Sequence, residues 1–260
     1  MTSFGGAILD VDGTIVRGDE RLPGAREGVQ ALRDAGVNLL LCSNNPTRPD
    51  EQHVARLADH GFVVDPGQVL TADTVTVDYL ASEHHGEDLF VVGEPHLNGR
   101  LRDGGFTLTE NPDAADVLVA SIDREFDYDR LTQAFWALET GAAFVATDPD
   151  LTIPTGERLV PGSGAIVNAI AGVAGREPDR VLGKPAPETA ATALERLGVD
   201  AEDCLVVGDR LDTDVALGER AGMTTALVLT GVTSRADVER ADVRPDYVLD
   251  SLVEVGQLLD

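Results

Sequence analysis

An apolar run that ends in two closely spaced carboxylates constrains this chain more than any other segment. Ala7–Leu9 are apolar, and Asp10 and Asp12 follow them before Gly13 and Thr14. If the run is a buried strand, both carboxylates lie at its carboxyl end, where open α/β sheets form their ligand crevices. Gly13 allows the chain to turn away, and Thr14 offers a hydroxyl and an N–H where a turn or helix begins. An acidic turn without function remains the alternative for this segment alone.

The same pattern of apolar runs and amphipathic helices continues through the chain and predicts an α/β fold. Strands separated by short helices are typical of βαβ units and a parallel sheet. Strands are expected at 4–9, 37–42, 204–207 and 225–229, and helices at 24–35, 51–60, 189–197 and 213–221. The middle of the chain repeats the alternation, with strands at 89–92, 117–120 and 143–146 and helices at 128–139 and 165–174. We therefore expect a discontinuous core, 1–78 and 179–260, with an inserted α/β domain at 79–178, in which Trp136 belongs to the apolar interior.

The charge balance excludes two classes of partner. The 260 residues include 46 acidic and 20 basic side chains, for a net charge of -26, and the acidic residues are spread along the chain. Such a surface repels nucleic acid and anionic membranes. No apolar run approaches the length of a membrane span, and no secretory signal precedes the first strand, so a cytoplasmic location is expected. Cys42 and Cys204, each beside an apolar run, are expected as buried free thiols.

Two further polar motifs follow apolar segments. Ser43-Asn44-Asn45-Pro46 comes directly after the strand at 37–42, and its short side chains and N–H groups suit an anionic oxygen, although they also suit a simple turn. Lys184, in Gly-Lys-Pro, is the only lysine of the sequence and follows a short apolar pair. A lysine there can neutralise an anionic substrate and a carboxylate nucleophile together, whereas an exposed turn lysine is the alternative.

A second acidic cluster follows the strand at 204–207. Asp209 comes directly after this strand, and Asp214 lies five residues further at an expected helix start. Mg2+ prefers a few carboxylate oxygens together with water and substrate phosphate. Asp10, the main-chain carbonyl of Asp12 and Asp209 would supply such a set, and Asp214 would either bind the ion or orient its waters.

These four motifs, in this order and each after an apolar strand, resemble the haloacid dehalogenase superfamily. The long insert between the second and third motifs is similar to that of its C2-capped branch, which includes NagD-like and 4-nitrophenyl phosphatases. The resemblance spans nearly the whole chain and extends to the segments Ala146–Asp150 and Pro161–Ala165. One departure is Asp148, because the branch usually has Asn at this position.

The resemblance implies a Mg2+-dependent phosphatase acting on small phosphate monoesters, namely sugar phosphates, glycerol phosphates or nucleoside monophosphates. It implies that Asp10 is the nucleophile that forms an aspartyl-phosphate, that Asp12 is the general acid and base, and that Lys184 stabilises the developing charge. The implied substrate-binding residues are Gly13, Thr14, Ser43, Asn44, Asn45 and Asp148. The implied metal-binding residues are Asp10, Asp12, Asp209 and Asp214. A homodimer formed through the cap is also consistent with the branch.

Other functions remain open at this point. A dehalogenase needs no acid at the position of Asp12, and a phosphomutase usually carries a cap before the second motif, where this chain has only about two dozen residues between Thr14 and Leu40. A non-catalytic protein that binds phosphate-containing ligands is the alternative from another class. Loss of a motif carboxylate or of Lys184 would favour it, and all of them are present.

The acidic composition resembles that of proteins from salt-accumulating organisms and leads to the hypothesis that folding or activity needs high salt. Salt at 1 M shortens the Debye length to about 3 Å and relieves repulsion among the carboxylates. We expect the thermal unfolding midpoint to rise between dilute buffer and 1 M NaCl, as followed by circular dichroism. Full folding and activity in dilute buffer, with a midpoint that salt leaves unchanged, would contradict this expectation.

Overall fold

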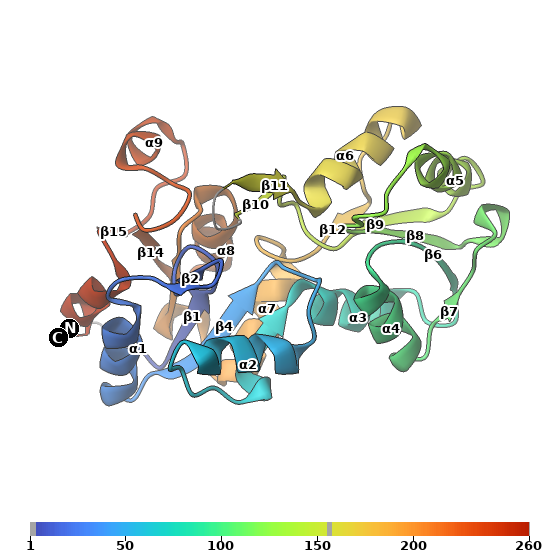
Figure 1. The fold of residues 1–260 in the computed structure, drawn as a ribbon. Coiled ribbons are helices and arrows are strands. Elements are labelled where there is room, and N and C mark those ends of the chain that lie inside the picture. Colours follow the sequence, from blue (N-terminus) through green and yellow to red (C-terminus); the bar gives the residue numbers. More distant parts are fainter. Residues whose placement is uncertain (1–3, 155–157, 260) are drawn as a thin grey trace.

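The chain forms two parallel sheets that lie side by side (Figure 1). The computed structural model describes residues 4–154 and 158–259. Residues 1–3, 155–157 and 260, which the expected domain ranges include, lie outside the described residues. Both termini of the described chain lie near α1 at the far side of the first sheet (Figure 1).

The first sheet carries the N-terminal motif on a central strand. Its order is β15-β14-β13-β1-β4-β5, with all neighbouring pairs parallel. Its apolar strands need cover on both faces, as parallel sheets do. The strands are β1 (Gly6–Asp10), β4 (Asn38–Ser43), β5 (Val69–Thr71), β13 (Cys204–Gly208), β14 (Thr224–Val228) and β15 (Tyr247–Leu249).

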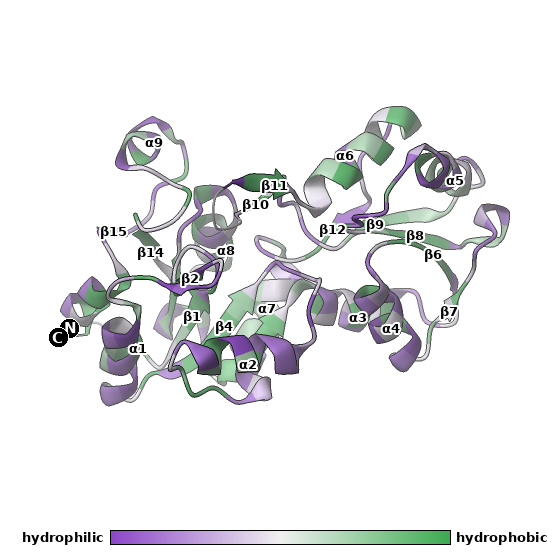
Figure 2. Cartoon of the chain, in the orientation of Figure 1, coloured by the Kyte–Doolittle hydropathy of each residue, from purple (hydrophilic) through white to green (hydrophobic). Residues whose placement is uncertain are grey.

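Alternating side chains of β1 divide the interior into two layers. Leu9 packs into the cluster that contains the buried face of α1, and Ile8 packs into the cluster that contains α7. Figure 2 shows hydrophobic strands such as β4 and β14 beside helices with hydrophilic turns. The helices of this part are α1 (Ala25–Asp34), α2 (Asp50–Asp59), α3 (Ala72–Glu83), α7 (Pro187–Leu197), α8 (Ala216–Ala221) and α9 (Arg235–Arg240).

The second sheet forms the cap and is also parallel, with the order β12-β9-β8-β6-β7. Its apolar cover on one face comes from α5 and α6. On the other face, Val91 and Val119 belong to the same cluster as Ile8, so one continuous apolar cluster joins the two sheets. The elements are β6 (Asp88–Val92), α4 (Pro95–Asp103), β7 (Thr107–Leu108), β8 (Val117–Ala120), α5 (Tyr128–Glu139), β9 (Ala143–Ala146), α6 (Ser163–Ala174) and β12 (Arg180–Val181).

Two short hairpins complete the strand set. One is β2 (Val16–Arg17) with β3 (Glu20–Arg21), directly after the N-terminal motif. The other is β10 (Thr152–Pro154) with β11 (Leu159–Pro161), between the cap and the core. Short helical turns cover 66–68, 112–114, 201–203 and 252–258, and a π-helical turn covers Leu211–Val215.

Most expected elements form within a few residues of the expected bounds, with local exceptions. Residues 213–221 are a π-helical turn followed by α8 rather than one helix. The cap sheet takes its last strand from Arg180–Val181, beyond the expected limit at 178, because this strand pairs with β9. The prediction for Trp136 is wrong: its side chain is 48% exposed, because α5 buries Ala134, Ala137 and Leu138 instead.

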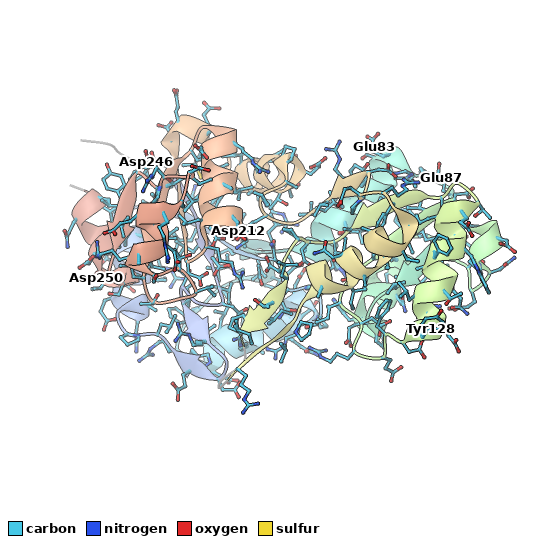
Figure 3. All side chains as sticks on the ribbon, turned by 90° about the horizontal axis from the view of Figure 1, so that it is seen from above. Glu83, Glu87, Tyr128, Asp212, Asp246 and Asp250 are labelled. Atoms are coloured by element: carbon cyan, nitrogen blue, oxygen red, sulfur yellow. The ribbon has the colours of Figure 1, made fainter. Side chains whose placement is uncertain are left out.

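The surface and the thiols agree with the composition. Acidic side chains such as Glu83, Glu87 and Asp250 lie at the periphery of both halves (Figure 3). Cys42 and Cys204 are free and buried, as predicted, and burial raises the pKa of both thiols to about 12. Among residues 4–154 and 158–259, no helix combines the length and apolar character that a membrane span requires.

The position of Leu9 predicts a large loss of stability on truncation. Leu9 is fully buried in the central strand β1. We expect Leu9→Ala to lower the free energy of unfolding by about 3 kcal/mol, through lost transfer energy and the cavity left behind. Leu159→Ala, at a side chain that is 58% exposed, is the matched control and should change it by less than about 0.5 kcal/mol. Denaturant unfolding measures both, and equal losses would contradict the assignment of Leu9 to the interior.

Candidate active site

The sequence motifs meet at the carboxyl edge of the first sheet. Neighbouring strands β13, β1 and β4 end at Gly208, Asp10 and Ser43, and Asp10 is in register with Cys42. The cavity at this edge has a volume of about 40 Å³. It therefore has room for a few water molecules or a small polar group. Its lining includes Asp10, Asp12, Ser43, Asn44, Asn45, Asp148, Asp150, Ile153, Lys184, Asp209 and Arg210.

Lys184 is the centre of this arrangement. Its Nζ lies 2.5 Å from Asp10 Oδ1 and 2.7 Å from Asp214 Oδ1, and it donates to the Cys42 carbonyl at 3.0 Å. The residue is only 2% exposed and is the single lysine of the sequence. Burial by itself lowers the pKa of a lysine, but the charges of Asp10 and Asp214 hold the pKa of Lys184 well above its usual range. The side chain is therefore a fixed cation at the base of the cavity.

Three buried carboxylates gather beside it. Asp10, Asp209 and Asp214 each offer an oxygen, and these oxygens lie within 4.8 Å of one another. Asp10 Oδ2 and Asp209 Oδ1 are buried and have no hydrogen-bond partner among the described residues. Burial, together with the charge of Asp214, raises the pKa of Asp209 to about 7. Unpartnered, mutually repelling carboxylate oxygens fit a divalent cation with oxygen ligands, so this donor set can hold a metal.

Asp209 and Asp214 are themselves fixed by backbone N–H groups. Asp209 Oδ2 accepts from Val232 N at 2.6 Å, and Asp214 Oδ2 accepts from Asp209 N at 3.1 Å and Arg210 N at 3.0 Å. Asp214 therefore has one oxygen bound by the backbone and the other in an ion pair with Lys184, whereas Asp209 Oδ1 has no such partner among the described residues.

Glycine is required next to Asp209. Gly13 has φ +108, which side-chain-bearing residues rarely adopt, and a Cβ on it would overlap the Asp209 carboxylate. A Cβ on Gly231 would overlap the same carboxylate. The two glycines therefore give Asp209 the space that it occupies beside Asp10.

Asp12 lines the cavity, but its carboxylate contacts a different cation. Asp12 Oδ1 lies 2.8 Å from Nη2 of Arg56, a residue of α2. The same Nη2 donates to the Gly18 carbonyl at 2.7 Å. The side chain of Asp12 is therefore outside the cluster around Lys184 while remaining at the cavity wall.

The second motif connects the N-terminal segment to the loop of Lys184. Asn44 Oδ1 accepts from Lys184 N at 2.6 Å, and Asn44 Nδ2 donates to the Lys184 carbonyl at 3.0 Å. Ser43 Oγ accepts from Asn45 N at 3.2 Å, and Asn45 Oδ1 accepts from Thr47 N and Oγ1. Ser43 and Asn44 are buried at the cavity, whereas the side chain of Asn45 stabilises the following turn.

The cap contributes acidic groups to the opposite wall. Asp148 is buried, accepts from Thr147 Oγ1 at 3.0 Å and from Asp150 N at 3.1 Å, and has its pKa raised to about 7 by burial and by the charge of Asp150. Asp150 Oδ1 accepts from Asn44 Nδ2 at 3.3 Å. The hairpin β10–β11 adds Ile153 to the wall.

The sequence motifs located most of these residues, with some exceptions. Thr14 is buried, is outside the cavity lining, and its hydroxyl has no partner among the described residues. Sequence reasoning missed Asp150 and Arg210 as cavity residues, although both lie within motifs that it used. It also missed Arg56, because nothing in the sequence distinguishes this arginine from the many others on expected helices.

Comparisons with known proteins agree with this geometry. The family model described as "Haloacid dehalogenase-like hydrolase" matches residues 7–107, and the one described as "HAD-hyrolase-like" matches residues 181–255. An acid sugar phosphatase of Staphylococcus aureus (strain USA300) is 33% identical over 254 residues, which cover 98% of this chain and 97% of the relative. The chain belongs to the haloacid dehalogenase-like hydrolases.

Solved structures narrow the family to one branch. The p-nitrophenyl phosphatase from Archaeoglobus fulgidus is 37% identical, with a TM-score of 0.91 over 99% of this chain and 100% of that one. NagD from E. coli K-12 is 32% identical, with a TM-score of 0.87 over 97% and 98% of the two chains. Within the family, the chain falls in the capped NagD-like branch, as the motifs predicted.

The role of Asp209 as a cation ligand can be tested by filling the space beside its carboxylate. Gly13→Ala adds a Cβ that overlaps the Asp209 carboxylate, whereas Gly36→Ala, at φ +76, adds one with no atom within 4 Å. Both should lose about 1–2 kcal/mol of stability from backbone strain. Only Gly13→Ala should also weaken the binding of a divalent cation, by tenfold or more in calorimetric titration with Mg2+. Equal Mg2+ affinity in the two variants would show that Asp209 does not bind the ion.

Proposed function

We propose that this protein is a Mg2+-dependent phosphatase that hydrolyses phosphate monoesters of small metabolites through an aspartyl-phosphate. The observation that carries the proposal is the buried ammonium of Lys184, 2.5 Å from Asp10, next to carboxylate oxygens that no described residue hydrogen-bonds. In this proposal, Asp10 is the nucleophile, Lys184 is the fixed positive charge, and the free carboxylate oxygens are the cation site, all at one small cavity. Membership in a branch with named phosphatases supports the same reaction.

In the first step, a carboxylate oxygen of Asp10 attacks phosphorus and the bond from phosphorus to the ester oxygen breaks. Lys184 offsets charge on Asp10 and on the transferring phosphoryl group. The departing alcohol oxygen takes its proton from Asp12. Ser43 and the N–H of Asn44 supply hydrogen bonds to the phosphoryl oxygens.

In the second step, Asp12 takes a proton from a water molecule, which attacks phosphorus and releases phosphate from Asp10. Asp10, the main-chain carbonyl of Asp12 and Asp209 would hold Mg2+. When bound, Mg2+ reduces the repulsion between the Asp10 carboxylate and the incoming phosphate dianion. Asp214, with both oxygens already engaged, orients Lys184 and the backbone at Asp209.

In this proposal the cap selects substrates by the alcohol portion of the phosphate ester. Sugar phosphates are the first class to test, because an acid sugar phosphatase is among the relatives. Gly13 leaves room for the Asp209 carboxylate because it has no side chain. Asn45 stabilises the turn that follows Ser43. Asp148 shapes the wall through its bonds to Thr147 and Asp150, rather than offering a free carboxylate. A homodimer stays a prediction.

The reaction is tested with 4-nitrophenyl phosphate in high salt. We expect hydrolysis that requires Mg2+, stops with EDTA and returns with added Mg2+. Asp10→Asn should lower kcat by at least about 10³-fold, because the amide is not a nucleophile. Calorimetric unfolding of the same sample serves as the folding control.

The outcome that contradicts the proposal is equally specific. A folded wild-type protein that binds phosphate with Mg2+ but hydrolyses neither 4-nitrophenyl phosphate nor a panel of sugar phosphates would indicate a phosphate-binding protein. Hydrolysis that survives in Asp10→Asn would place the nucleophile elsewhere.

A further inference from the structure

We propose that Arg56 is the positioning residue for Asp12 and thereby sets how well the enzyme expels poor leaving groups. This inference rests on the proposed phosphatase function, in which Asp12 is the general acid and base. It assigns a role to a helical arginine that none of the four motifs contains. Arg56 touches Asp12 and not the reacting atoms, so its effect must act through that carboxylate.

The contact is specific and largely shielded from water. Arg56 Nη2 lies 2.8 Å from Asp12 Oδ1, and the two side chains are 13% and 20% exposed. Exposed ion pairs contribute little because solvent screens them, but a partly buried pair holds a defined geometry. The contact also joins residues 44 positions apart in sequence, one in α2 and one directly after β1.

The same guanidinium fixes the segment that follows Asp12. Arg56 Nη2 donates to the carbonyl of Gly18, which lies in the turn between β2 and β3. Gly13 N donates to the Val16 carbonyl at 2.8 Å, so this hairpin is tied to the residue next to Asp12. Arg56 therefore holds both the carboxylate and the hairpin that supports its backbone.

The geometry suits the two proton transfers proposed for Asp12. Its Oδ1 is bound by Arg56 while the side chain still lines the cavity, so one oxygen is held and the other can exchange a proton. In the first step the proton moves from Asp12 to the leaving alcohol oxygen, and in the second it moves from water to Asp12. Loss of Arg56 leaves the carboxylate free to rotate away from both transfers, and proton transfer needs it within hydrogen-bond reach.

Leaving-group chemistry separates this role from a structural one. The 4-nitrophenolate anion departs without a proton, whereas the alkoxide of glucose 6-phosphate requires one. The parameter kcat/KM reports events through departure of the leaving group. We expect Arg56→Gln to lower kcat/KM for glucose 6-phosphate about 10- to 100-fold, within the usual range for general acid catalysis, and that for 4-nitrophenyl phosphate by less than about twofold.

The second step gives a readout that needs 4-nitrophenyl phosphate alone. With Asp12 misplaced, water attack on the aspartyl-phosphate slows, so stopped-flow traces of Arg56→Gln should show a burst of nitrophenolate followed by slower turnover. Asp12→Asn should show the same burst. Arg56→Lys, which keeps a donor and a charge, should restore part of the loss in both assays.

Controls distinguish the possible failures. Arg124→Gln removes an arginine–glutamate pair of 2.9 Å in the cap and should behave as wild type. Arg56→Gln placed on Asp12→Asn should cause no further loss. Equal losses of kcat/KM for both esters without a burst, or additive losses in the double variant, would overturn the role of Arg56. An inactive but folded wild type would instead overturn the phosphatase itself.

Discussion

The rest of the site depends on one buried ion pair network, in which Lys184 joins Asp10 to Asp214. Transferring a charge from water into the protein interior costs several kcal/mol, and only close, well-aligned partners offset that cost. Here the ammonium donates hydrogen bonds to Asp10 Oδ1 and the Cys42 carbonyl, and it forms an ion pair with Asp214 Oδ1 at 2.7 Å. Any change that displaces one partner leaves the others as uncompensated buried charges. The strands that present these groups must therefore hold their positions closely.

The parallel sheet supplies that precision. Asp10 and Lys184 are 174 residues apart, and they meet because β1 ends beside the loop that follows β12. Asn44 fixes this loop because its side chain accepts from the Lys184 N–H and donates to the Lys184 carbonyl. The apolar cluster that runs from Ile8 to Val91 and Val119 holds the cap sheet against the same edge. The cap and the core are thus positioned by one continuous interior rather than by a linker alone.

Much of this could be predicted from the sequence, because apolar runs and the polar residues after them are local signals. The strand ending at Asp10 and the motifs at Ser43, Lys184 and Asp209 are of this kind. Arg56 and Trp136 were not predictable in the same way, because their roles depend on which helix face the tertiary packing buries. For α5, small alanines lie against the sheet and the large indole lies outside. The contact of Arg56 with Asp12 forms only because the tertiary fold packs α2 beside Asp12.

The composition explains why the site cation is a lysine in a chain that otherwise uses arginine. The other nineteen cationic side chains are arginines, in a chain with a large acidic excess. A guanidinium presents its donors in one plane, whereas an ammonium directs three donors in a tetrahedral arrangement. Asp10 Oδ1, Asp214 Oδ1 and the Cys42 carbonyl surround Nζ as three separate acceptors. The compact ammonium of Lys184 reaches these acceptors from a buried position, 2% exposed. A strongly acidic protein thereby keeps a local positive charge where an anionic substrate must bind.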